Sequence, residues 1–220
     1  MSSTTKERIQ FLDALRGGSI LLVVAYHFGY NLVLLNHLPI GVLYHPLLRF
    51  LQPFFAGLFI LLAGISSRLS KNNLKRGFGL LLCALLITTV SYFAGMLITF
   101  GILRLLAVCI LLYTLLEKLR VTMPVVLMSS FLLLFFRIFQ WPRWSSADYF
   151  PLVPWGFLFF LGVWLGDPIR EGKFPNWFYK VKIPFLPAIG RKTLIIYLAH
   201  QPVLFGLLFL FEWAVKVVNS

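Results

Sequence analysis

The chain has 220 residues, of which 60% are hydrophobic, 17% aromatic and only 12% charged, about half the charged share of a typical soluble domain. So little polar surface could not cover a water-soluble globule of this size, which excludes the ordinary soluble classes and indicates a protein embedded in lipid. The net charge of +13 does not indicate nucleic-acid binding, because the basic residues stand in short segments between apolar runs.

The apolar runs predict an all-α fold, a polytopic transmembrane helical bundle of about seven helices, because each crossing of a bilayer needs ~20 apolar residues. The predicted helices cover about residues 11–35, 48–69, 77–98, 102–116, 123–139, 152–165 and 193–215. The fourth and sixth runs are short for a full crossing. No soluble domain is predicted, so we expect residues 1–220 to form one integral-membrane domain whose helices and short loops carry any chemistry.

The basic residues alternate between the two ends of the predicted helices. The segments before the first helix and after the second, fourth and sixth are rich in Lys and Arg: Lys6, Arg8, Arg68, Lys71, Lys75, Arg76, Lys118, Arg120, Arg170, Lys173, Lys180, Lys182, Arg191 and Lys192. The opposite segments hold few: Arg49, Arg104, Arg137, Arg143 and Lys216. Because cytoplasmic loops are enriched in Lys and Arg, we predict a cytoplasmic N-terminus and an external C-terminus.

The first predicted helix carries polar residues that are costly inside a membrane. Asp13 and Arg16 are three residues apart, so they share a helix face and can pair. His27 lies about 20° from three full turns beyond Arg16, and ~16 Å further along the axis. Asn31 follows one turn later. Such a stripe indicates a functional site. The alternative is a snorkelling Arg16 and a His27 that packs between helices.

The last predicted helix contains the polar pair His200 and Gln201, followed at once by Pro202. Proline cannot donate a backbone hydrogen bond, so the helix is opened locally there. An opened helix with polar side chains is tolerated in a membrane where it lines a cavity. We expect His200 at about the same shallow depth as Arg16 and Asp13, with these three lining one cavity in the cytoplasmic half. The alternative is an ordinary proline kink with one interhelical histidine bond.

The loops predicted on the outer side hold further candidates for substrate binding. His37 and His45 lie between the first and second helices, and Asp148 lies among aromatic residues before the sixth. An acid held among aromatic side chains at the mouth of a bundle could bind a sugar or an amine, although an exposed loop aspartate is the simpler interpretation. Within the second helix, Gly64 and Ser66 indicate close packing against another helix.

Several stretches resemble transmembrane acyltransferases. The stretch RIQFLDALRGGSILLVVAYHFGYNL resembles their first helix, and Arg16 and His27 match the Arg-x10-His spacing of the acyltransferase-3 family. Four later pieces resemble the catalytic-domain family of heparan-α-glucosaminide N-acetyltransferase: FAGLFILLAGISSRLS, FGILRLLAV, ADYFPLVPWGFLFFLGVWLG and AIGRKTLIIYLAHQPVLFG. Together the pieces touch most of the chain, in the same order and topology as in the family.

The resemblance implies an enzyme that takes an acyl group, commonly acetyl, from acyl-CoA on the cytoplasmic side. It passes this group to a hydroxyl or amine of a saccharide or glycoconjugate on the other side. By resemblance, His27 is the general base and Arg16 meets the acyl donor. The lysosomal enzyme of the family has Asn where His27 stands and its important histidine a little later, which makes His37 or His45 alternative candidates. The short chain implies a multi-pass protein of a bacterial plasma membrane.

The residue types suit this chemistry independently of the resemblance. Acyl transfer from a thioester needs a base such as histidine, and donors such as Asn31, arginine or glutamine for the developing oxyanion. The basic rim suits polyanionic CoA as co-substrate, and the absence of metal-ligand spacing predicts no metal. The main alternative is a proton-coupled transporter or flippase, because a membrane-buried Asp, Arg and His set also suits a proton relay. A structural or assembly partner is a third reading.

Overall fold

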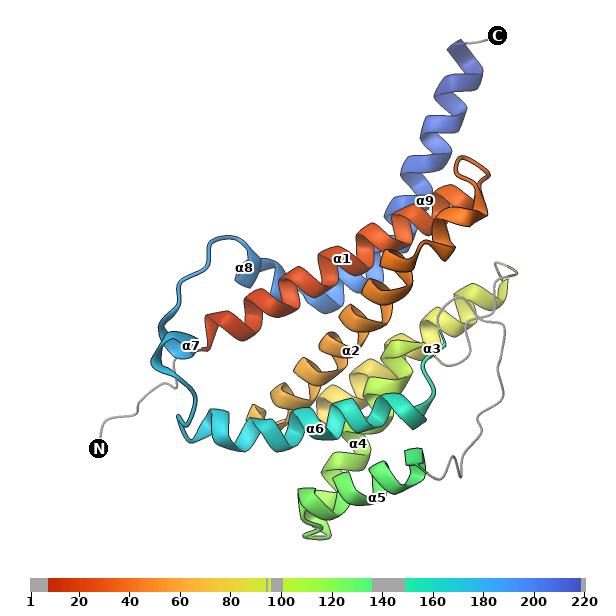
Figure 1. Cartoon of the computed structure of the whole chain (residues 1–220). Helices are drawn as coiled ribbons and strands as arrows, with labels where there is room; N and C mark the ends of the chain where they lie inside the picture. The colour runs from red at the N-terminus through yellow and green to blue at the C-terminus, as the bar shows by residue number, and fades with distance from the viewer. Residues whose placement is uncertain (1–7, 94, 96–100, 136–148, 219–220) are drawn as a thin grey trace. The chain divides into compact units, whose positions relative to one another are not determined.

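The computed structural model describes residues 8–93, 95, 101–135 and 149–218, and all regular structure within them is helical (Figure 1). The predicted all-α class is therefore confirmed. In chain order the elements are α1 (Gln10–Leu34), the 3-10 helix η1 (Ile40–Tyr44), α2 (Pro46–Leu69), α3 (Asn73–Phe93), α4 (Ile102–Lys118), α5 (Met123–Phe135), α6 (Leu152–Arg170), α7 (Asn176–Lys180), α8 (Leu186–Arg191) and α9 (Thr193–Val218).

Each predicted helix has a counterpart among these elements, and the bounds that can be compared differ by a few residues. The predicted ends of the third and fifth helices, near residues 98 and 139, lie outside the described residues. The clearest difference is α6, which was predicted to end near residue 165 and continues to Arg170. Asp167 and Arg170 pair with each other across this last helical turn at 3.3 Å, and such a pair stabilises a helix. The short helices α7 and α8 lie in a segment for which no helix was predicted.

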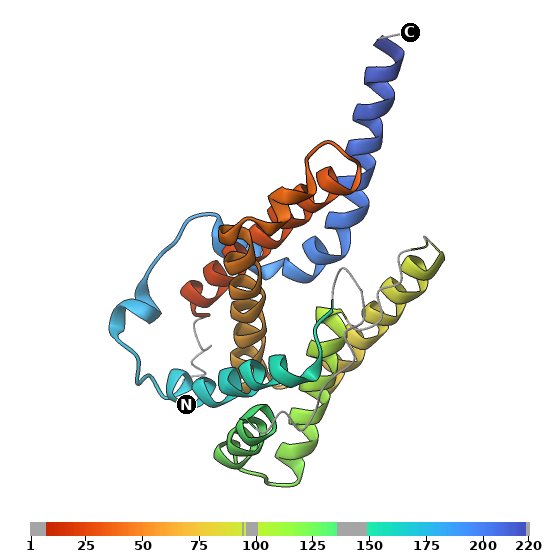
Figure 2. The same cartoon turned by 45° about the vertical axis from the view of Figure 1, so that its right-hand side comes forward.

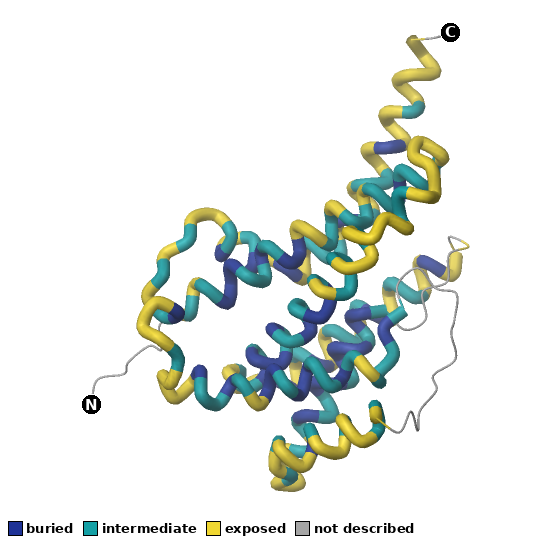
Figure 3. The backbone as a smooth tube through the Cα atoms, viewed as in Figure 1, coloured by how far each residue is buried: buried dark blue, intermediate teal, exposed yellow. Residues whose placement is uncertain are grey.

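Within the described residues, five helices are long and apolar enough to cross a membrane, namely α1, α2, α3, α6 and α9. α4 and α5 are shorter, with 17 and 13 residues, so a crossing by these two remains a prediction. Large apolar side chains stay exposed along the second half of α9, among them Phe209, Phe211 and Trp213 (Figure 3). A multi-pass protein with lipid around these helices accounts for that surface.

The chain divides into two compact units. Unit 1 comprises Met1–Phe59 and Pro175–Ser220, and unit 2 comprises Ile60–Phe174. Unit 1 thus joins the first helix of the chain to the last three, α7, α8 and α9, with η1 and the first part of α2. Unit 2 contains the last part of α2 together with α3, α4, α5 and α6.

In unit 1, the short helix α8 packs against the first half of α1, and α9 follows along the second half (Figures 1 and 2). Two glycines make this approach close. A β-carbon on Gly17 would collide with the Leu186 carbonyl, and one on Gly190 would collide with the Asp13 carbonyl. The two backbones can therefore touch only because both positions lack a side chain.

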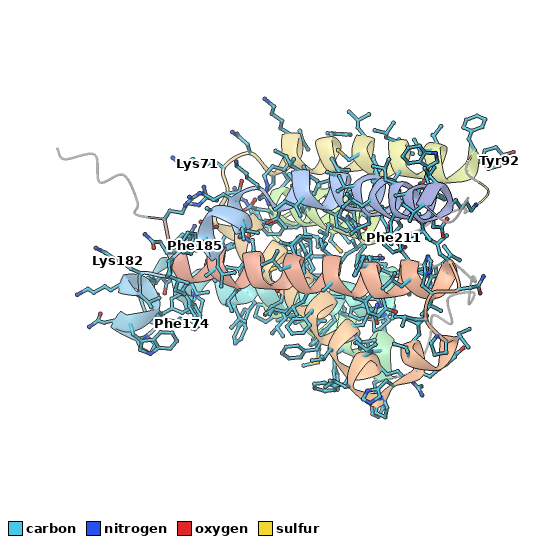
Figure 4. The ribbon with its side chains drawn as sticks, turned by 90° about the horizontal axis from the view of Figure 1, so that it is seen from above. Lys71, Tyr92, Phe174, Lys182, Phe185 and Phe211 are labelled. Carbon is cyan, nitrogen blue, oxygen red and sulfur yellow. The ribbon has the colours of Figure 1, made fainter. Side chains whose placement is uncertain are left out.

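Aromatic side chains fix α7 to the beginning of α1. The ring of Phe11 meets the rings of Trp177 and Phe178 edge to face, each with 5.3 Å between centroids. Figure 4 shows Lys182 and Phe185 at the end of unit 1 where α1 begins, and Phe211 toward the end where α1 finishes. The segment from α7 to α8 is thus held at one end of unit 1.

In unit 2, α2 and α6 also approach through glycines. A β-carbon on Gly64 would meet the Phe159 carbonyl, and one on Gly162 would meet the Leu61 carbonyl. The close packing predicted at Gly64 is therefore confirmed. Ser66 donates its hydroxyl hydrogen bond to a carbonyl of its own helix.

One arginine links three helices of unit 2 at their charged ends. Arg68 of α2 pairs with Asp167 of α6 at 2.7 Å and with Glu117 of α4 at 3.1 Å. The Tyr113 hydroxyl accepts a further bond from Arg68 and donates to Glu117. These contacts hold the ends of α2, α4 and α6 together.

Candidate active site

Two apolar helices of unit 1 bring four polar side chains together. α1 supplies His27 and Asn31, which lie one turn apart, and α9 supplies His200 and Gln201 from the turn before Pro202. Polar side chains are costly toward lipid, so the polar face of each helix is most stable against that of the other. We name His27, Asn31, His200 and Gln201 the histidine–amide cluster.

Gln201 stands at the centre of this cluster. Its Oε1 accepts a hydrogen bond from Asn31 Nδ2 at 3.0 Å, and its Nε2 donates one to His27 Nδ1 at 2.9 Å. The His200 ring lies beside the His27 ring, with 5.0 Å between centroids. His200 Nδ1 donates to the Tyr197 carbonyl oxygen at 2.6 Å. The cluster is therefore a connected arrangement of two imidazoles and two amides.

Two polar atoms of the cluster are buried without a partner. Asn31 and His200 are 1% and 7% exposed, and neither Asn31 Oδ1 nor His200 Nε2 has a hydrogen-bond partner among the residues that the structure describes. A buried polar group left unpaired costs about 1–3 kcal/mol. A cluster that keeps two such atoms among the described residues is suited to bind a polar ligand.

The chemistry of these groups is that of proton transfer next to neutral hydrogen-bond donors. A neutral imidazole can take a proton from a hydroxyl or amine, and the amides and the second imidazole can donate to a developing oxyanion. Within the described part of the chain, no group of three His, Cys, Asp or Glu side chains is placed to hold a metal ion.

A separate charged cluster lies near the start of α1. Asp13 is 3% exposed and pairs with Arg8 at 2.6 Å and with Arg16 at 3.2 Å. The predicted pairing of Asp13 with Arg16 is therefore confirmed. Arg8 was not predicted as a partner, although a basic residue just before a helix that begins with a buried acid is the signal that could have indicated it.

The predicted depth of His200 was wrong. We expected it beside Asp13 and Arg16, but the structure places it beside His27, ~16 Å further along α1 by helix rise. The physical reason is α8, which occupies the side of α1 around Gly17 before α9 begins. His200 therefore joins Asn31 and Gln201 in one cluster.

The predicted loop residues lie outside this cluster. His37 Nε2 donates to Glu212 Oε1 of α9 at 3.1 Å, with both side chains about one-third exposed. His45 is exposed, and its Nδ1 accepts a bond from the Leu47 backbone at the start of α2. Asp148 is outside the described residues. Glu212 was missed by the sequence reasoning, because an acid in the last turns of an apolar helix gave no indication of its partner.

The fold and the cluster define a class: a multi-pass helical membrane protein with two histidines, His27 half-buried and His200 buried, between two of its helices. Residues 8–202 match the family described as heparan-alpha-glucosaminide N-acetyltransferase, catalytic, and the chain belongs to this family. The predicted resemblance to this catalytic-domain family is thereby confirmed, and the matched range includes the whole histidine–amide cluster. Comparisons with curated proteins and with solved structures gave no match.

Proposed function

We propose that this protein is a membrane-embedded acyltransferase. It moves an acyl group, in the first place acetyl, from acyl-CoA to a hydroxyl or amine of a saccharide or glycoconjugate. The observation that carries the proposal is the histidine–amide cluster, in which Asn31 and His200 are buried, inside the stretch that matches an N-acetyltransferase catalytic family.

The cluster contains what direct transfer needs. A histidine takes the proton of the acceptor as its oxygen or nitrogen attacks the thioester carbonyl, which typically accelerates the reaction ~10²–10⁴-fold. Hydrogen-bond donors stabilise the oxyanion that forms on the carbonyl oxygen. Asn31 Oδ1 and His200 Nε2, the two buried atoms without a partner in the described residues, are available to bond a ligand.

The charge of unit 1 suits a donor that enters from one end. Basic residues gather where α1 begins: Arg8, Arg16, Lys180, Lys182, Arg191 and Lys192. CoA is a polyanion, so this end attracts it, and with the predicted orientation it faces the cytoplasm. The pantetheine arm would carry the thioester along α1 toward His27, ~16 Å from Arg16 by helix rise. The acceptor approaches from the opposite end.

The direct test is release of CoA by purified protein in lipid nanodiscs. With acetyl-CoA and a panel of amino sugars and neutral sugars, we expect thiol release that depends on the acceptor, together with an acetylated sugar detected by mass spectrometry. Thr89→Ala is the control for a substitution outside the cluster and should transfer acetyl like the wild type. Thr89 is exposed on α3, and its hydroxyl donates to the Leu85 carbonyl of the same helix.

Two outcomes would refute parts of the proposal. Thiol release without any acetylated acceptor would indicate a hydrolase. The other outcome is full transfer by a double variant that removes both histidines of the cluster, His27→Ala with His200→Ala, while His37→Ala or His45→Ala loses it. That result would place the base in the loop that follows α1.

A further inference from the structure

The proposed function leaves open which histidine removes the proton from the acceptor. The two imidazoles differ in which ring nitrogen is already engaged, and this difference decides the question. In a neutral imidazole one nitrogen carries hydrogen and the other carries the basic lone pair, and the hydrogen bond made by one nitrogen sets the role of the other.

His200 is held with its basic nitrogen free. Its Nδ1 lies 2.6 Å from the Tyr197 carbonyl oxygen, which can only accept, so Nδ1 carries the hydrogen. The lone pair therefore belongs to Nε2. That atom is buried and has no partner among the described residues. An imidazole oriented by a backbone carbonyl on one nitrogen, with the other nitrogen open, is the geometry of a general base.

His27 is held in the opposite form. Its Nδ1 accepts an amide hydrogen from Gln201 Nε2 at 2.9 Å. The Gln201 amide presents its nitrogen to His27 because its oxygen, Oε1, faces Asn31 and accepts a hydrogen bond from Asn31 Nδ2 at 3.0 Å. With Nδ1 used as the acceptor, the hydrogen of neutral His27 sits on Nε2. His27 is thus a donor. Its Nε2–H can stabilise an oxyanion, but it cannot take a proton in this form.

We infer that His200 is the general base of the transfer and that His27 is the oxyanion donor, held in that form by the chain of amides from Asn31 through Gln201. This division of roles rests on the proposed function. It differs from the sequence-based expectation of His27 as the base. The ring centroids are 5.0 Å apart, which suits two imidazoles that serve one tetrahedral centre. The attacking atom, oxygen or nitrogen, and the carbonyl oxygen of that centre each need a partner at about 2.6–3.2 Å.

The step balances without a further reactant. The acceptor oxygen or nitrogen forms a bond to the thioester carbon as its proton passes to His200 Nε2, and the carbonyl oxygen becomes an oxyanion bonded by His27 Nε2–H. The C–S bond then breaks, the oxyanion reverts to a carbonyl, and the CoA thiolate takes the proton from His200. Both histidines end in the forms in which they began.

The tautomers can be measured without any activity. The chain has four histidines, so nitrogen-15 NMR of histidine-labelled protein in nanodiscs gives four ring systems that His37→Asn and His45→Asn help to assign. We expect the neutral ring of His200 to carry hydrogen on Nδ1 and that of His27 on Nε2. The reversed pattern, with the two amides turned the other way, would overturn the assignment.

Substitution by glutamine separates a base from a donor, because an amide can donate but cannot take a proton at neutral pH. His200→Gln should lower kcat by ~10²–10⁴-fold, as loss of a general base does. His27→Ala should lower kcat by ~10²–10³-fold, while His27→Gln should stay within about tenfold of the wild type, because it keeps a donor. Thermal unfolding of each variant shows whether the fold is intact.

The inference and the proposed function fail differently. If the wild type transfers acetyl but His200→Gln stays active and His27→Gln is as inactive as His27→Ala, the roles are reversed and only the inference is lost. If the folded wild type transfers nothing to any acceptor, the proposed function is refuted, and the catalytic roles with it, even where the tautomers match.

Discussion

At the scale of single residues, the sequence singled out the four polar positions of the histidine–amide cluster but not which of their atoms bond to one another. His27, Asn31, His200 and Gln201 all stood out because polar side chains are costly in apolar helices. Which atom bonds to which depends on how two helices far apart in the chain align, and spacing within one helix carries no information on that. Gln201, which the sequence showed only as the neighbour of His200, joins Asn31 to His27.

The central position of Gln201 gives a prediction at this scale. Gln201→Met keeps the length of the side chain and removes both amide bonds, so His27 Nδ1 loses its donor and Asn31 Nδ2 loses its acceptor. Nitrogen-15 NMR should then show a mixture of His27 tautomers in place of a single one. We expect kcat to fall in proportion to the molecules that lose the oxyanion donor, about twofold for an even mixture.

Gln10→Met is the control for this change, because Gln10 is exposed at the start of α1. It should alter neither the tautomer nor the rate. If His27 keeps one form in Gln201→Met, then Gln201 does not set that form.

At the scale of the elements, helix positions followed well from apolar runs, and the contact of α1 with α8 did not. Each predicted helix was found, because ~20 consecutive apolar residues have few other stable arrangements in a bilayer. α8 was missed because Leu186–Arg191 is short and follows a segment rich in proline and lysine. Its only signal was glycine: Gly190 on α8 and Gly17 on α1 permit the contact that also sets the depth of His200.

Two neighbouring glycines of α1 provide a matched pair of variants. Gly17→Ala puts a β-carbon against the Leu186 carbonyl, whereas a β-carbon on Gly18 meets nothing within 4 Å. We expect Gly17→Ala to destabilise the protein by about 1–3 kcal/mol, since overpacking displaces backbone. Gly18→Ala should be neutral or stabilising by about 0.5–1 kcal/mol, because alanine is the better helix former.

Thermal unfolding in the same detergent or nanodisc would compare the two variants. Equal unfolding temperatures for Gly17→Ala and Gly18→Ala would show that α8 does not pack on α1 as described. A large loss in Gly18→Ala alone would point to a different face of α1 as the buried one.

At the scale of the whole molecule, the basic residues predict how the protein lies in the membrane. The sequence could predict this because loop charge is read directly from the chain, while the fold that joins the first helix to the last three in one unit could not be read from it. Such long-range pairing depends on which polar faces and glycines match, and many arrangements share the same apolar pattern.

Reporter fusions test the orientation. C-terminal fusions after Lys75 and after Arg191 should both report the cytoplasm, because basic segments stay on that side. A fusion after His45 should report the outside, since it follows one crossing by α1. An external signal at either basic site would break the predicted topology and would place the basic end of unit 1 on the side that lacks CoA.

The claim that this chain transfers acyl groups is tested most directly in proteoliposomes that contain the purified protein and a trapped amino sugar. Radiolabelled acetyl-CoA is added outside, and the trapped sugar is recovered and analysed for label. We predict labelled N-acetyl sugar inside the wild-type vesicles and a loss of ~10²-fold or more with His200→Gln, as expected for removal of the base. Unlabelled sugar in vesicles of folded wild-type protein would contradict the account, and escape of that unmodified sugar would indicate a transporter instead.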